Sequence, residues 1–447
     1  MSLRTNILNA RHHIVFILGL SIAFSIIFAI ENKEFKEDLV NAIVFSDNIP
    51  TPSPRPLTVD ELRWANIAWK YFENNTQDSG LVNSVNNYPS TTLWDTASYL
   101  MGLISADKLK IINRKEFELR LTSALNALER IPLFDNQLPN KAYDTQKIIM
   151  VNYDNSPNLR GIGWSAIDIG RLLVPFNILV WQYPKYTKQL TNVLSRWHME
   201  PLLQQGLMYG ATLIDEQTEY VQEGRIGYEE YAAKSLNLMG KDVSQALRYS
   251  DFLSMENIEN VLVPTDKRDP IRYQAHNYVV SESYILDGLE FGWDRISREF
   301  AWRVYQAQQG RFQRTGILTA VSEDNIDSPP YFVYNTIFSA GQAWNAVGED
   351  GSDASAFKTL STKAAFGWYA LYRDDYSQQL LAAVNTLYDP QQGWYSGQYE
   401  TLNRPNQAIT ANTNGIILES LLYIQQGQLL QIGTRTGPVR LAQTGEE

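Results

Sequence analysis

The sequence predicts an all-α fold, a closed ring of paired helices with short β segments in the loops at one face. Apolar residues recur at helical spacing along most of the chain, and no long alternating strand pattern occurs. About a dozen helices within roughly 370 residues suit such a ring better than a four-helix bundle. A polar residue, a glycine and two apolar residues recur in four turns, each followed by a polar stretch. Polar chemistry should therefore collect at one end of the ring.

The expected helices follow one another along the folded domain. Thr58 and Glu61 form a capping box that starts the first helix, and Thr91 or Thr92 can cap the second. The predicted ranges are 58–75, 92–106, 114–130, 164–183, 185–204, 228–239, 242–250, 277–291, 294–309, 331–347, 354–372, 376–388 and 412–425.

The N-terminal region predicts a transmembrane helix. Arg4 and Arg11 precede an uncharged apolar run over residues 14–30, and Glu31 follows it. This order is typical of a secretory signal or of an uncleaved signal anchor with its N-terminus inside. Because no clear A-x-A cleavage site follows, we expect a single-pass protein of the bacterial inner membrane with a periplasmic domain. Cleavage, which would release the protein into the periplasm, is the alternative.

Four segments are expected along the chain. Residues 1–31 form a cytoplasmic stub and the anchor, and residues 32–57 form a Pro-rich periplasmic tether that is poor at joining a core. Residues 58–430 form the helical domain, and residues 431–447 form a flexible tail.

Composition excludes several classes of function. The 38 Lys and Arg residues against 49 Asp and Glu residues give a net charge of -11, which opposes binding to nucleic acid. Cysteine is absent, so disulfides, thiolate metal sites and a Cys nucleophile are excluded. The 4 His residues have no metal-binding spacing, and no nucleotide-binding glycine loop occurs. We therefore expect no metal and no cofactor.

Acid–base chemistry would then fall to carboxyl groups, and hydrolysis of a glycosidic bond needs only two of them. Most carboxylates in proteins are helix caps or solvated charges. Two stand out here. Asp95 follows Trp94 in the first turn of a predicted helix, where the helix dipole favours a carboxylate. Glu229 begins a helix beside Tyr228, and aromatic walls raise a carboxyl pKa as a general acid requires. Further catalytic candidates are Glu230, Glu282 and Glu323.

Aromatic residues predict a sugar-binding surface. The chain has 11 Trp and 25 Tyr, whose flat faces can stack on pyranose rings. Aromatic residues on helices are more often core, so those in glycine-containing loops, above all Trp394 and Tyr395, are better candidates. The predicted substrate-binding residues are Trp94, Trp164, Asp168, Tyr228, Tyr331, Trp394, Tyr395 and Glu400.

Several stretches carry a resemblance to a known family, namely TTLWDTASYLMGLISA, RGIGWSAIDIGRLL, EGRIGYEEYAAKSLNLMG, LTAVSEDNIDSPPYFVYNTIFSAGQAW and GWYSGQYE with TANTNGIILESLLY. Over about residues 58–428 the chain resembles the bacterial envelope proteins grouped as domain of unknown function 3131. It is distantly similar to the glucoamylase-like (α/α)6 family that includes endo-β-1,2-glucanases. The resemblance implies a six-hairpin toroid that acts on, or binds, a β-glucan or another envelope polysaccharide.

Three hypotheses follow. The leading one is a membrane-tethered periplasmic glycoside hydrolase that inverts, with Glu229 as general acid and Asp95 as base or water-positioning group. The alternative is a non-catalytic polysaccharide-binding or export accessory protein that holds glycan for a glycosyltransferase or export complex. The third is a lyase that would use His276 beside Arg272 and Tyr278.

Overall fold

The computed structural model describes residues 43–223, 225–268, 273 and 277–432. The predicted anchor over residues 14–30 lies outside these residues, as do Arg272 and His276 of the lyase hypothesis. Among the residues that the structure describes, no helix combines the length and the apolar character that crossing a bilayer requires.

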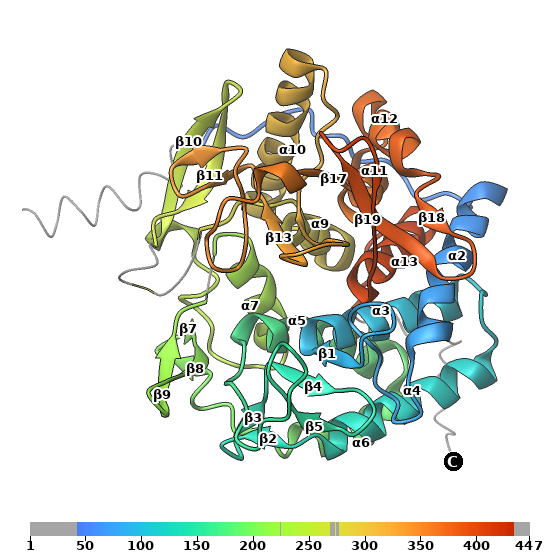
Figure 1. Cartoon of the computed structure of the whole chain (residues 1–447), viewed down its shortest axis with the longest axis vertical. Coiled ribbons are helices and arrows are strands. Elements are labelled where there is room, and N and C mark those ends of the chain that lie inside the picture. Colours follow the sequence, from blue (N-terminus) through green and yellow to red (C-terminus); the bar gives the residue numbers. More distant parts are fainter. Residues whose placement is uncertain (1–42, 224, 269–272, 274–276, 433–447) are drawn as a thin grey trace, which may run out of the picture.

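Six helices form a closed inner ring. Each contacts the next in the order α3, α5, α7, α9, α11 and α13, and α13 returns to α3 (Figure 1). They span Leu93–Lys108, Ala166–Gln182, Tyr228–Leu238, Glu282–Leu286, Thr362–Tyr372 and Ala411–Gln426, and the π-helical turn η3, Asp287–Phe291, continues α9. A helix that is apolar on all sides is buried on all sides. In α3, for example, every residue from Thr96 to Asp107 is buried.

Further helices pack around the outside of this ring. α2 contacts α3 and α13, α4 contacts α3 and α6, α10 contacts α9, and α12 contacts α11. Their bounds are Val59–Asn75 for α2, Arg114–Arg130 for α4, Thr187–Leu194 for α6, Arg295–Thr315 for α10 and Asp375–Val384 for α12, with the short helix η1, Pro184–Tyr186, before α6. The predicted helix-rich ring is confirmed.

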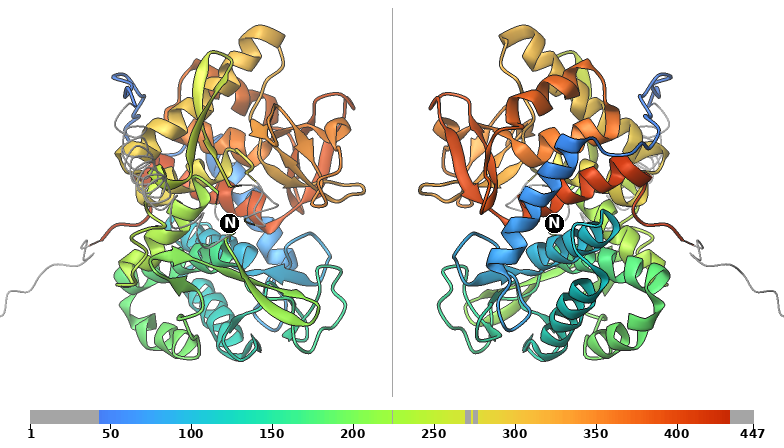
Figure 2. Two further views of the ribbon diagram at one scale, coloured as in Figure 1. Left: turned by 90° about the vertical axis from the view of Figure 1, so that its left-hand side faces the viewer. Right: turned by 90° about the vertical axis from the view of Figure 1, so that its right-hand side faces the viewer.

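The strands lie in the connections between helices, and two antiparallel sheets flank the start of the inner ring. One has the order β1-β4-β5 and spans Ser90–Thr92, Ala142–Asp144 and Ile149–Met150. The other has the order β12-β13-β16 and spans Glu323–Asn325, Phe332–Asn335 and Ala346–Val347. Figure 2 shows the segments that carry these sheets on the same side of the helices.

Further antiparallel pairings, one of them a four-stranded sheet, complete the loops. β10 pairs with β11 as a hairpin against α10, and β19 pairs with β17, β18 and β20. The bounds of the remaining strands are β2 Leu133–Phe134, β3 Leu138–Pro139, β6 Leu203–Gln204, β7 Leu207–Met208, β8 Gly210–Ile214, β9 Gln217–Val221, β10 Leu253–Ile258, β11 Val261–Asp266, β14 Phe338–Ser339, β15 Gln342–Ala343, β17 Thr359–Ser361, β18 Tyr388–Asp389, β19 Gly393–Tyr399 and β20 Pro405–Ile409.

Some predicted helices are wrong. Residues 331–347 form strands β13 to β16, because their aromatic and β-branched side chains alternate between a buried and a half-buried face. Residues 242–248 form no helix, and only the short 3-10 helix η2, Tyr249–Asp251, follows them. The predicted helices over 185–204 and 354–372 are shortened to α6 and α11, and the residues lost form turns, 3-10 helices and the strands β6 and β17. Short apolar runs fit helix and strand alike, so periodicity alone could not separate them.

Residues 43–57, predicted as part of a tether that is poor at joining a core, pack along the outside of the ring. Ile43 is buried in the main core, and the backbone N–H of Ser46 donates to Glu299 of α10 at 2.8 Å. Arg55 makes two bonds of 2.7 Å to Glu61 at the start of α2. Proline has a fixed φ and no N–H, so the prolines of this segment suit an extended strap that forms no ladder.

Candidate active site

A cavity of about 970 Å³ opens where the inner helices begin. Every inner helix contributes a first-turn side chain to its wall, namely Trp94 and Asp95 of α3, Ile167 and Asp168 of α5, Tyr228 of α7, Glu282 of α9, Lys363 of α11 and Asn412 of α13. All six helices therefore direct their N-terminal ends, with unpaired N–H groups and positive dipole ends, at one space. Its volume is near the upper end of the roughly 300–1,000 Å³ found for small-molecule sites.

Asp95 is a half-buried carboxyl held by two hydroxyl groups. Ser84 and Thr92 donate to its Oδ2 at 2.5 and 2.8 Å, and Thr92 also caps α3 by accepting the N–H of Asp95. Burial raises the pKa of Asp95 above its usual range, although the two hydroxyl bonds oppose the shift. Oδ1 has no hydrogen bond within the described part of the chain. One carboxyl oxygen is thus fixed and the other is left for a ligand.

Asp168 repeats this arrangement on the neighbouring helix. It is the third residue of α5, as Asp95 is of α3, and it bonds through Oδ1 to the N-cap hydroxyl of Ser165 at 3.2 Å. Burial raises the pKa of Asp168 to about 7, and the charges of Glu223 and Asp95 add to the shift. The side chain of Glu223 lies at the N-terminal end of α5, where its carboxylate accepts the N–H of Ala166 at 2.6 Å. Two carboxyls therefore face the cavity from adjacent helices, and the charge of Asp95 disfavours ionisation of Asp168.

The floor of the cavity is a buried ionic cluster around Glu282. Trp94 and Asn412 donate to its Oε1 at 2.9 and 2.8 Å, and Lys363 lies 2.5 Å from Oε2. Lys363 also lies 3.3 Å from Asp324, and burial raises the pKa of Asp324 to about 6. Because both oxygens of Glu282 are already occupied, this carboxylate is suited to tying α3, α9, α11 and α13 together.

Glu323 belongs to an aromatic wall. Its carboxylate accepts the hydroxyl of Tyr228 and lies 3.5 Å from Nη1 of Arg225. The Arg225 guanidinium lies 5.0 to 5.7 Å from the ring centres of Tyr228, Tyr278 and Tyr334, and the last two rings stack at 4.2 Å. These cation–π contacts hold the rings at the edge of the cavity.

Two predicted catalytic residues do not line the cavity. Glu229 is buried behind Tyr228, where its Oε2 pairs with Arg268 at 2.5 Å. Glu230 turns back on its own helix and accepts the N–H of Gly227 at 2.7 Å, while burial, reinforced by Glu229, raises the pKa of Glu230 to about 8. Successive helical residues point in different directions, so Tyr228 faces the cavity and the next two residues do not.

Some of the predicted aromatic binding residues line the cavity, and others do not. Trp94, Tyr228 and Tyr331 line the cavity. Trp164 and Trp394 are fully buried in the core, where their indole N–H groups donate to the carbonyls of Tyr209 and Trp64 at 3.0 and 3.1 Å. Tyr395, next to Trp394 on β19, is half-buried against the core and does not line the cavity either. Large rings in glycine-containing loops are therefore packing residues at these positions.

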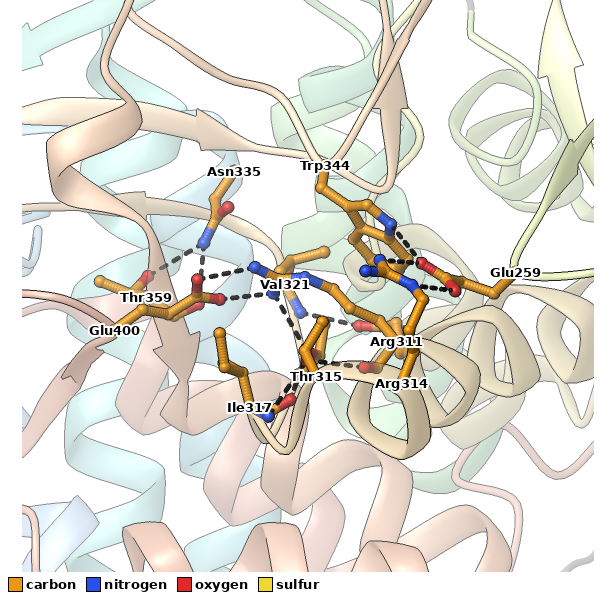
Figure 3. Close-up of polar contacts among 12 residues, drawn as sticks. Glu259, Arg311, Arg314, Thr315, Ile317, Val321, Asn335, Trp344, Thr359 and Glu400 are labelled. Atoms are coloured by element: carbon orange, nitrogen blue, oxygen red, sulfur yellow. Dashed lines mark hydrogen bonds and ion pairs between the residues drawn. The ribbon is translucent and has the colours of Figure 1, made fainter.

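Glu400 is also outside the cavity, in a polar clamp behind it (Figure 3). Arg311 of α10 makes two bonds to the Glu400 carboxylate, at 2.6 and 2.8 Å, and its guanidinium lies 5.1 Å from the Trp344 ring. Glu259, in the β10–β11 turn, accepts the indole N–H of Trp344 at 3.1 Å and pairs with Arg314. The clamp joins a helix, a hairpin and two loops, which explains why the side chain of Glu400 is enclosed.

The predicted site does not include several polar residues that line the cavity, among them Lys141, Tyr153, Glu223, Arg225, Lys363 and Asn412. One signal was available. Lys363 is the only charged residue of the apolar helix α11, and a lone charge in a buried helix needs a partner. The others sit in loops or polar runs that carry no such signal. Within the described ranges, no group of three or more Asp, Glu or His is placed to hold a metal ion.

The arrangement defines a class of protein. Six inner helices whose N-terminal ends surround an aromatic, carboxylate-lined cavity form an (α/α)6 toroid. More specifically, the chain belongs to the family described as protein of unknown function DUF3131, whose model matches residues 63–427. The membership expected from the sequence is confirmed. No curated protein matches the chain.

Solved structures share the fold. An endo-β-1,2-glucanase from Chitinophaga pinensis, in complex with sophorotriose and glucose, has 12% identity and a TM-score of 0.58, over 84% of this chain and 94% of that one. A candidate glucoamylase from Bacteroides caccae has 14% identity and a TM-score of 0.57, over 83% and 95%. An endo-β-1,2-glucanase mutant from Talaromyces funiculosus, in complex with β-1,2-glucan, has 10% identity and a TM-score of 0.52, over 83% and 85%.

Proposed function

We propose that this protein is a membrane-tethered periplasmic glycoside hydrolase that acts on a β-glucan or another envelope polysaccharide. The observation that carries the proposal is the pair Asp95 and Asp168, two coupled carboxyls with raised pKa values at one cavity wall. The fold is shared with proteins named as β-1,2-glucanases, which makes β-1,2-glucan the first substrate to test. The tether and the location rest on the apolar run over residues 14–30.

Asp168 is assigned as the general acid. A carboxyl with a pKa of about 7 remains substantially protonated at neutral pH, which is the state that can protonate a leaving oxygen. The negative charges of Glu223 and Asp95 help to hold this proton. Asp168 therefore replaces Glu229, whose carboxylate is committed to Arg268 outside the cavity.

Asp95 is assigned as the general base. Two hydroxyl bonds and the positive charge of Lys363 favour its ionised form, against the effect of burial. Its Oδ1 is the oxygen that can take a proton from water, since both hydroxyl groups bind Oδ2. Two interacting carboxyls in unlike surroundings divide the acid and base roles between them.

Inversion of configuration is part of the proposal. Asp95 and Asp168 hold the same position on the neighbouring inner helices α3 and α5, and both line the cavity. In inverting enzymes the two carboxyls are roughly 6.5–9.5 Å apart, which leaves room for the attacking water. Trp94 and Tyr228, whose ring centres lie 5.6 Å apart, would bind the sugar rings from the adjoining wall.

The test is a reducing-end release assay of the detergent-solubilised protein against β-1,2-glucan, other β-glucans, mannans and bacterial exopolysaccharides. The parent protein is expected to release ends from at least one glycan, and Asp95→Asn and Asp168→Asn to lower the rate about 10²- to 10⁴-fold. Asp215→Asn, an exposed change in the β8–β9 turn, is the matched control and should keep the parent rate. Binding of a glycan without release from any of them would instead support the polysaccharide-binding accessory role.

A further inference from the structure

Exposed aromatic side chains gather at the mouth of the cavity. Five large aromatic residues are exposed in the described part of the chain, namely Tyr88, Tyr153, Trp181, Tyr220 and Tyr331. Three of the five, Tyr88, Tyr153 and Tyr331, line the cavity, and the last two of these are 60% and 62% exposed. Scattered exposed rings are ordinary, but a concentration at one opening marks a surface built to bind something.

The three rings come from loops beside two different sheets. Tyr88 precedes β1 and Tyr153 follows β5, and the hydroxyl of Tyr88 donates to the carbonyl of Tyr153 at 3.1 Å. Tyr331 immediately precedes β13. In Figure 1 the β1-β4-β5 sheet lies below the centre of the ring and β13 lies above it. The cavity is thus bordered by an aromatic rim on each side.

The backbone holds Tyr331 in place. Its φ of 69° lies in the left-handed region that a large side chain rarely adopts. Its N–H donates to Ser328 at 2.8 Å, and its carbonyl accepts the N–H of Ile326 at 3.0 Å. Strain of this kind persists where surrounding bonds determine the conformation, and it is often found at ligand-binding positions.

We propose that the two rims bind sugar units on both sides of the reaction centre, so that the enzyme cuts within polysaccharide chains rather than at their ends. The inference rests on the proposed function, which it makes more specific. A glycan that crosses the cavity can stack on Tyr88 and Tyr153 at one side and on Tyr331 at the other. A site that removes terminal sugars needs such a platform on one side only.

The experiment compares long β-1,2-glucan with the tetrasaccharide sophorotetraose as substrates for the full chain. The parent is expected to lower the viscosity of the polymer well before many reducing ends appear. Tyr331→Ala and Tyr153→Ala are each expected to raise KM for the polymer about tenfold, with a smaller effect on the tetrasaccharide. The control Tyr220→Ala removes another exposed ring, on β9, that does not line the cavity, and it should change neither value.

Viscosity that falls only in step with reducing ends would overturn the proposal, as would equal losses on both substrates. If the parent releases no ends at all, the hydrolase assignment fails and the rims are tested by affinity electrophoresis in β-1,2-glucan. Retardation that is weakened by Tyr331→Ala and Tyr153→Ala, but not by Tyr220→Ala, would still support glycan binding across both rims. Retardation that none of these variants changes, or no retardation of the parent, would reject it.

Discussion

Asp95 and Asp168 occupy the third position of their helices, yet Glu230 at the third position of α7 does not reach the cavity. The difference lies in the N-cap. Thr92 and Ser165 satisfy the first free amides of α3 and α5 through their hydroxyls, so the aspartates are free to face the ligand space. α7 begins after Gly227, which has no side chain, and Glu230 must bind the backbone itself.

The raised pKa of Asp168 has a consequence for stability. Its pKa increases from 3.8 to about 7 on folding, because burial and neighbouring charges disfavour the carboxylate. Stability from this group is therefore present at low pH and is lost as the pH rises from about 4 to about 7. Asp168→Asn removes that loss. The variant should have a higher Tm than the parent at pH 8 and a similar Tm at pH 4, as measured by calorimetry; a lower Tm at pH 8 would contradict the raised pKa.

Glu229→Gln should lower the stability of the protein without lowering its kcat. Loss of the charge weakens the buried pair with Arg268 and costs roughly 1–3 kcal/mol of stability. Because Glu229 does not line the cavity, the folded variant should keep kcat within about twofold of the parent. Urea denaturation and steady-state kinetics measure the two effects. A kcat reduced as strongly as in Asp168→Asn would restore Glu229 as the general acid.

Some residues of the site could be predicted from the sequence, and others could not. Asp95 could be found because a capping threonine, an aromatic neighbour and an apolar helix surround it in sequence. Asp168 was predicted too, but as a binding residue, because its raised pKa depends on burial in the folded ring and on the charge of Glu223, which is distant in sequence. Partners across the ring are not visible in a local pattern, so carboxyls in similar sequence surroundings could not be separated into cavity and core.

Among the elements, the cluster around Lys363 joins α9, α11 and β12. Lys363 lies 2.5 Å from Glu282 and 3.3 Å from Asp324, and all three side chains are buried. Lys363→Met would leave the two carboxylates without their cation. Removing one partner from a buried ionic pair costs about 3–5 kcal/mol, so the variant should be strongly destabilised in urea denaturation.

An exposed pair provides the control. Lys185 pairs with Glu118 on the outer surface, and Lys185→Met should cost no more than about 1 kcal/mol. Adding Glu282→Gln to Lys363→Met should recover part of the loss, because one uncompensated charge is removed. Equal small costs for both lysines would show that the buried cluster does not hold the elements together.

Long helices with clear caps were predictable, and short connections were not. The bounds of α4 match the predicted range 114–130, and α2, α3, α5 and α13 deviate by only a few residues. The region 331–347 was misassigned because its alternating burial depends on pairing with β12, which no local pattern contains. Helices follow from local periodicity, whereas strand pairing depends on residues that meet only in the folded chain.

At the scale of the whole molecule, ring closure depends on contacts between distant parts of the chain. Arg171 of α5 is fully buried, pairs with Glu290 of η3 and Glu419 of α13, and bonds to Tyr231 of α7. Four inner segments meet at this one side chain. The number of helices in the sequence could predict a ring of hairpins. It could not predict which polar residues connect the inner helices to one another.

The strap formed by residues 43–57 should contribute to the stability of the whole domain. It buries Ile43 and places Arg55 against Glu61 and the carbonyl of Pro56. A chain that begins at residue 58 should therefore unfold at lower urea concentration than one that begins at residue 43. Indistinguishable midpoints would show that the strap is a passive connection, as the sequence suggested.

If Asp168 donates the proton that hydrolysis requires, the pH dependence of kcat/KM should follow the ionisation of this carboxyl. On the best substrate of the panel, the parent should lose activity above about pH 7, because the acid becomes deprotonated. Asp168→Asn should be about 10²- to 10⁴-fold slower and should lack this alkaline limb. A variant that keeps the parent rate and the same alkaline limb would contradict the claim.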